Sequence, residues 1–107
     1  MRQWIWLALL GAMHSASGAA AQEAGDPAAG LEFARSVCAE CHAVESGERI
    51  SPNPLSPAFV EIASVPGMTT TALVVVLSNP HREMPDLILG RDELRDVAAY
   101  ILTLKPD

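Results

Sequence analysis

The sequence predicts an all-α fold, a small domain of three to five helices, and three features support this class. The chain has 107 residues, about the length of one domain. Half of its residues are hydrophobic and 19% are charged, a balance typical of a globular protein rather than a disordered one. Its clearest periodic segment, near the C-terminus, has apolar residues at spacings of three and four.

The first 21 residues have the layout of a secretory signal peptide. Arg2 is followed by a run of nine apolar residues, 4–12, and then by small residues at 15–21. The run is short of the ~20 residues that cross a bilayer as a helix, so an uncleaved anchor is the minor alternative. We therefore expect a signal peptide at 1–21 and a domain at 22–107, with cleavage after Ala21 or, as a second possibility, after Gly18.

Two cysteines and a histidine carry the chemistry of this chain. Cys38, Cys41 and His42 have the spacing of the c-type haem attachment motif. Two thiols one helical turn apart can reach the two vinyl groups on one edge of a porphyrin, and the next residue directs an imidazole at the iron. Covalent attachment of one haem c is an export-side process in bacteria, in agreement with the signal peptide.

Three other interpretations of the same residues are weaker. A disulfide between cysteines three apart closes a very small loop and stabilises little. A thioredoxin-like redox pair needs a βαβ context that is missing here. A zinc site needs a fourth ligand, and His81 is the only other histidine after residue 21.

Local signals predict four helices separated by loops. Asp26 as N-cap and Pro27 at the first position begin a helix that continues to Cys38. The last helix has acidic residues in its first turn, where they complement the helix dipole. Between them, the β-branched run of 74–76 would equally suit a strand by propensity, but its length and flanks favour a helix. The expected segments are a loop at 43–57, a short helix at 58–64, a helix at 72–78 capped by Thr69, Thr70 or Thr71, a loop at 81–89 and a terminal helix from Asp92 to Leu104.

The order of motifs resembles the class I monohaem cytochromes c over most of residues 26–105. The features that match are Gly30, residues 38–42, Pro52-Asn53, Met84-Pro85, and a terminal helix with Tyr100. The resemblance implies a small cytochrome c fold wrapped around one haem, in which the first and last helices cross. Gly30 would permit their close approach near Tyr100.

The resemblance also implies roles for the site residues. Cys38 and Cys41 form thioethers to the haem, and His42 and Met84 are the two axial ligands of the iron. In the family a proline carbonyl accepts from the histidine, and Pro52 is the matching position here, with Pro54 as an alternative.

The residues themselves leave the sixth ligand open. The proline after Met84 disfavours helical backbone there, so the side chain projects from an extended loop, as a remote ligand should. Met68, His81 or an open position are the alternatives. A His/Met pair raises the reduction potential, whereas an open site would bind small ligands. Arg49 could pair with a haem propionate or be a solvated loop residue. The candidate core residues are Leu55, Phe59, Ile62, Leu73, Leu77, Leu87, Leu89, Val97 and Ile101.

Charge constrains the partners. The formal net charge of −6 argues against nucleic acid, and a membrane would be contacted only through a partner or an uncleaved signal segment. We expect a periplasmic one-electron carrier that exchanges electrons with redox proteins through a basic or apolar patch on them. The alternatives are a haem subunit of a larger oxidoreductase complex, and a ligand-binding or catalytic haem protein with Met84 off the iron. No constellation of catalytic acid, base and nucleophile is present, so we do not expect an enzyme.

Overall fold

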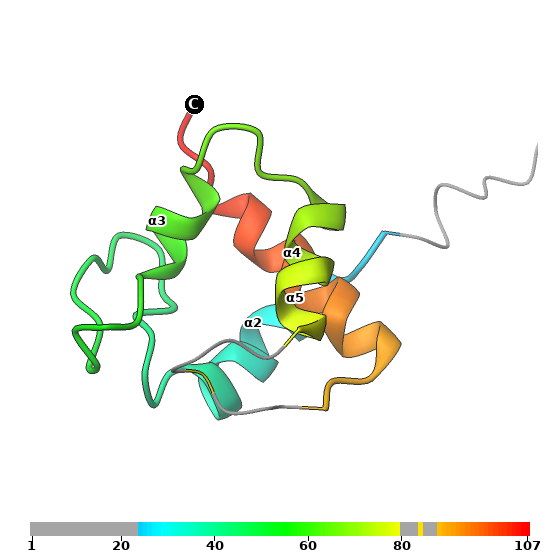
Figure 1. Ribbon diagram of the computed structural model, residues 1–107, viewed down its shortest axis with the longest axis horizontal. Helices are drawn as coiled ribbons and strands as arrows, with labels where there is room; N and C mark the ends of the chain where they lie inside the picture. Colours follow the sequence, from blue (N-terminus) through cyan, green and yellow to red (C-terminus); the bar gives the residue numbers. More distant parts are fainter. Residues whose placement is uncertain (1–23, 80–83, 85–87) are drawn as a thin grey trace, which may run out of the picture.

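The structure is a computed structural model that describes residues 24–79, 84 and 88–107. Within these residues it contains α-helices and one π-helical turn and no strand, which confirms the all-α class. The predicted signal peptide, His81 and Leu87 lie outside the described residues. No helix in the described part of the chain combines the length and apolar character that crossing a membrane requires. The elements are α2 (Pro27–Phe33), η1 (Ala34–Cys38), α3 (Phe59–Ala63), α4 (Thr70–Ser78) and α5 (Arg91–Thr103) (Figure 1).

The first helix begins as predicted and then changes its winding. Asp26 is the N-cap, its carboxylate accepting from the Ala28 N–H at 2.9 Å, and Pro27 follows at the first helical position. From Ala34 the chain winds as a π-helix, with the Ala39 N–H donating to the Ala34 carbonyl at 2.9 Å. Single π-turns in helices occur frequently at functional sites. Here the wide turn ends at Cys38.

The other helices begin at local caps. The Thr69 hydroxyl accepts from the Ala72 N–H at 3.1 Å, so Thr69 is the capping residue among the three threonines, and α4 starts two residues before the predicted helix. Residues 74–76 are helical, which confirms the interpretation from length and flanks over β-propensity. In α5 the Glu93 carboxylate accepts from the Gly90 N–H at 2.8 Å, and α5 therefore begins at Arg91, one residue before the prediction.

Helices α2 and α5 cross in direct contact, as expected (Figure 1). Gly30 is buried at the crossing, where an added Cβ would lie 1.9 Å from the Asp96 carbonyl oxygen and 2.9 Å from the Cβ of Tyr100. Gly25 makes a second close approach, because a Cβ there would lie 2.1 Å from the Arg95 carbonyl oxygen. The Asp26 N–H also donates to the Asp96 carboxylate at 2.7 Å. Two glycines and this hydrogen bond set the separation of the helices.

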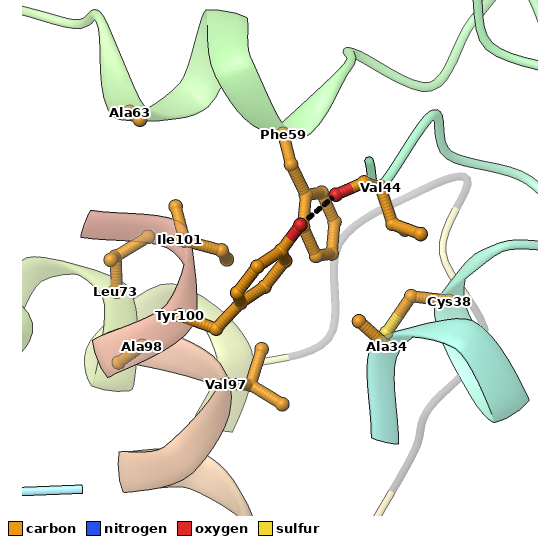
Figure 2. Packing of buried hydrophobic residues seen from close by; sticks show 10 residues of the cluster. All are labelled: Ala34, Cys38, Val44, Phe59, Ala63, Leu73, Val97, Ala98, Tyr100 and Ile101. Atoms are coloured by element: carbon orange, nitrogen blue, oxygen red, sulfur yellow. Dashed lines mark hydrogen bonds between the residues drawn. The ribbon is translucent and has the colours of Figure 1, made fainter. Parts of the chain in front are cut away.

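The hydrophobic core surrounds α5 and draws on η1, on the residues just after the motif, on α3 and on α4 (Figure 2). Leu31 and Phe33 of α2 are partly buried and pack against it. Four of the predicted core residues are buried, namely Phe59, Leu73, Val97 and Ile101. Ile62 and Leu77 are partly buried and pack against this cluster, and Leu89 is half-buried. The prediction for Leu55 was wrong, since its side chain is 71% exposed. It lies in the proline-rich loop, whose backbone turns at Asn53 and directs the leucine away from the core.

Candidate functional site

An apolar cavity opens between the attachment motif, α3, α4 and α5. It encloses about 680 Å³ of space not filled by protein atoms, part of it open to solvent. A mostly apolar wall with a few polar groups is typical of sites for small molecules and cofactors. Except for the imidazole of His42, the side chains of its wall are apolar or sulfur-containing. The lining residues are Cys38, His42, Pro57, Phe59, Ile62, Met68, Leu73, Val76, Leu77, Met84 and Ile101.

The imidazole of His42 is oriented by a backbone carbonyl. Its Nδ1 lies 2.7 Å from the Pro57 oxygen. Because a carbonyl oxygen only accepts, Nδ1 carries the proton, and the lone pair of Nε2 is left for a metal. The ring of Phe59 packs beside the imidazole, with ring centroids 5.5 Å apart. This arrangement is the one in which a histidine ligand is held in a fixed tautomer and orientation.

The acceptor for His42 is therefore Pro57, and the prediction of Pro52 or Pro54 was wrong. The loop folds back so that the Asn53 N–H donates to the Cys41 carbonyl at 3.1 Å. The Pro52-Asn53 pair therefore contacts the backbone of the motif and not the imidazole of His42. Pro57 comes two residues before α3, where the chain re-enters the core.

Two further bonds join Ala43, the residue directly after the motif, to the far part of the loop of residues 43–57 and to the start of α3. The Ala43 N–H donates to the Ser51 hydroxyl at 2.9 Å, and the Phe59 N–H donates to the Ala43 carbonyl at 2.8 Å. Gly47 has φ +82°, a left-handed conformation that favours glycine, and allows the turn at the start of the loop. These bonds bring Ser51 and Phe59 back beside Ala43, at the beginning of the loop.

The two cysteines have different surroundings. Both are free thiols, so they do not form the small disulfide considered above. Cys38 is 8% exposed and lines the cavity, and burial raises the pKa of its thiol to about 11. Cys41 is half-buried and is not part of the described cavity wall. The Cys41 N–H and the His42 N–H both donate to the Cys38 carbonyl, which forms the tight turn of the motif.

The structure brings Met84 to the same cavity as His42 and Cys38, although 42 residues separate Met84 from His42. Met68 also lines this cavity and is half-buried, with its carbonyl accepting from the Lys105 ammonium at 3.3 Å. Both methionines considered as ligands are thus on the wall of one cavity. Arg49 is exposed on the loop.

Sequence reasoning missed the contacts that fix the chain after His42. The buried Tyr100 hydroxyl donates to the Val44 carbonyl at 2.5 Å, across 56 residues of sequence (Figure 2). The Arg35 guanidinium makes two bonds to the Glu45 carboxylate, at 2.5 and 3.1 Å, and this pairing lowers the pKa of Glu45. Burial raises the pKa of Tyr100, so its hydroxyl stays a donor at neutral pH. No local sequence pattern predicts the pairing of Tyr100 with Val44 or that of Arg35 with Glu45.

The apolar cavity, the oriented imidazole of His42 and the pair of cysteines beside it fit an iron porphyrin, and together they define a haem protein of the c type. The chain is 36% identical over 98 residues to cytochrome c-552 of Bradyrhizobium diazoefficiens, an alignment that covers 92% of this chain and 90% of that protein. It therefore belongs to the c-type cytochromes, electron-transfer proteins with covalently bound haem c. No protein-family model matches it, and no solved structure matches it significantly.

Proposed function

We propose that this protein is a class I monohaem cytochrome c that carries single electrons in the periplasm. In this proposal Cys38 and Cys41 hold the haem as thioethers, and His42 and Met84 are the axial ligands. The observation that carries it is the cavity whose wall contains Cys38, His42 and Met84 together. When bound, haem c supplies an iron that alternates between the ferric and ferrous states.

The chain's own residues account for how such an iron would be tuned. The hydrogen bond from Nδ1 to Pro57 would strengthen the donation of Nε2 to an iron, which favours the ferric state. A thioether from Met84 is a soft ligand and favours ferrous iron, so the His/Met pair supports a raised reduction potential. The apolar walls from α3, α4 and α5 would limit the access of water to a haem held between them.

The export and partner assignments have separate support. The pattern of residues 1–21 supports secretion, and periplasmic fractionation of a tagged chain tests it. An acidic chain favours redox partners with basic surface, since complementary charge speeds encounter. The association rate should accordingly fall as salt is added.

The axial ligation is tested by comparing Met84→Ala with its matched control, Met68→Ala. Both substitutions remove a methionine from the wall of the same cavity. Purified holoprotein should show the weak charge-transfer band of thioether-ligated ferric haem, and only Met84→Ala should lose it. Reduced Met84→Ala should also bind carbon monoxide rapidly, while the parent and Met68→Ala should not. Loss of the band in Met68→Ala, with Met84→Ala unchanged, would contradict the assignment.

A further inference from the structure

Two of the most exposed large apolar side chains belong to the loop that follows the attachment motif. Ile50 is 91% exposed and Leu55 is 71% exposed. Single exposed apolar residues are ordinary on protein surfaces, but these two occur within six residues of one loop. Residues 50–60 also contain no charged side chain, in a chain with 20 charged residues. The loop therefore presents an uncharged, apolar surface.

This loop is held rigid. The Leu55 N–H donates to the Asn53 side-chain oxygen at 2.9 Å, and the Ser56 N–H donates to the Asn53 carbonyl at 3.0 Å. Three prolines, at 52, 54 and 57, restrict its backbone further. A surface that is already ordered loses less conformational entropy when a partner binds, so apolar contacts on it contribute more of their energy to association.

The loop is fastened to the part of the motif that is nearest the surface. Ser51 bonds Ala43, Asn53 bonds Cys41, and Pro57 bonds His42, which places residues 50–57 along residues 41–43. Cys41 is half-buried, whereas Cys38 is buried. Thioethers form at the periphery of a porphyrin, so a partner seated on this loop would approach the cofactor at its edge beside Cys41.

Acidic residues flank this uncharged stretch in the sequence and precede Cys41, to which the loop is bonded. Glu48 precedes Ile50 by two residues, Glu61 follows the uncharged stretch directly, and Glu40 is next to Cys41 in the chain. All three are exposed, against one exposed cation, Arg49. Complementarity of charge therefore favours a partner with basic groups around an uncharged contact.

From these observations we propose that residues 50–57 form the docking surface for the redox partner, with Ile50 and Leu55 as its main contacts. The partner is a redox protein whose contact patch is apolar at its centre and basic at its rim. This inference rests on the proposed function, because it assigns the place where an electron carrier meets its partner.

The test uses holoprotein on gold electrodes coated with mixed methyl- and ammonium-terminated alkanethiols, which imitate an apolar patch with a basic rim. The double variant Ile50→Ser/Leu55→Ser is compared with the parent and with Val75→Ser. Val75 is 55% exposed on α4, which Figure 1 shows well apart from this loop. Interfacial electron transfer, measured by voltammetry, should slow at least about tenfold in the double variant, a change that corresponds to ~1.4 kcal/mol. Val75→Ser should stay within about twofold of the parent.

The reduction potential and the absorption spectrum should be the same in all three proteins, which separates docking from damage to the haem site. An unchanged rate in the double variant, or an equal loss in Val75→Ser, would overturn the docking surface. Sedimentation that shows a dimer abolished in the double variant would assign the loop to self-association and overturn it as well. A parent spectrum without the thioether band would instead count against the proposed function and leave the docking comparison intact.

Discussion

Replacing Gly30 by alanine should destabilise the protein strongly, because the new methyl group has no room. It would lie 1.9 Å from the Asp96 carbonyl oxygen, and contacts of a Cβ below 3.0 Å are essentially never seen. Helices α2 and α5 would have to separate by about 1 Å, since the clash is with backbone and no side chain can rotate away. Overpacking of this kind costs up to ~3 kcal/mol, and the better helix propensity of alanine returns ~1 kcal/mol. We expect a net loss of about 2 kcal/mol in the free energy of unfolding.

Urea unfolding of the holoprotein, followed by circular dichroism, measures this loss, and the thermal midpoint should fall by roughly 8–16 °C for a domain of this size. Gly90→Ala is the matched control. A Cβ at Gly90 would come no closer than 3.4 Å, to a carboxylate oxygen of Glu93 that can move, and its φ of −64° suits alanine. This control should cost less than about 1 kcal/mol. If Gly30→Ala were no more destabilising than Gly90→Ala, the close crossing of the two helices would be refuted.

Three further substitutions test contacts around the site. Tyr100→Phe keeps the ring but leaves the buried Val44 carbonyl without its donor. Urea unfolding should therefore show that the free energy of unfolding falls by ~1–3 kcal/mol. A fall of less than ~0.5 kcal/mol would mean that the hydrogen bond is not formed. Arg35→Gln removes the partner that lowers the pKa of Glu45. The variant should have a smaller free energy of unfolding than the parent above the usual carboxyl pKa, and this difference should disappear as the pH falls through the lowered pKa of Glu45. A difference that does not depend on pH would contradict the ion pair. Thr69→Ala removes the cap of α4 and should cost ~0.5–2 kcal/mol in urea unfolding, whereas Thr69→Asn should cost little.

Features encoded by neighbouring residues were predictable. The start of α2 follows from Asp26 and Pro27, which act on the next few backbone groups. The motif at 38–42 is a fixed spacing whose chemistry needs no knowledge of the rest of the chain. The apolar stripe of α5 predicted both the helix and its buried face, because helical periodicity is itself local.

Features that depend on the path of a loop were not predictable. Pro52, Pro54 and Pro57 are equivalent as isolated residues, and only the bonds of Asn53 and Ser51 decide which carbonyl reaches His42. The same path determines that Leu55 faces solvent. Leu55 was assigned to the core from its hydrophobicity alone. It lies in a loop between prolines, where no helical periodicity indicates which residues are buried.

The helix crossing and the candidate site are physically coupled through one side chain. The Cβ of Tyr100 is 2.9 Å from where a methyl group on Gly30 would stand, and its hydroxyl holds Val44, two residues after His42. Its ring also packs against Phe59, at 6.4 Å between centroids, and Phe59 packs against His42. A displacement of α5 at Gly30 therefore moves both the backbone after His42 and the ring beside it. It follows that the separation of α2 and α5 affects the orientation of the imidazole as well as the stability of the fold, so small residues at this crossing serve the site and the core together.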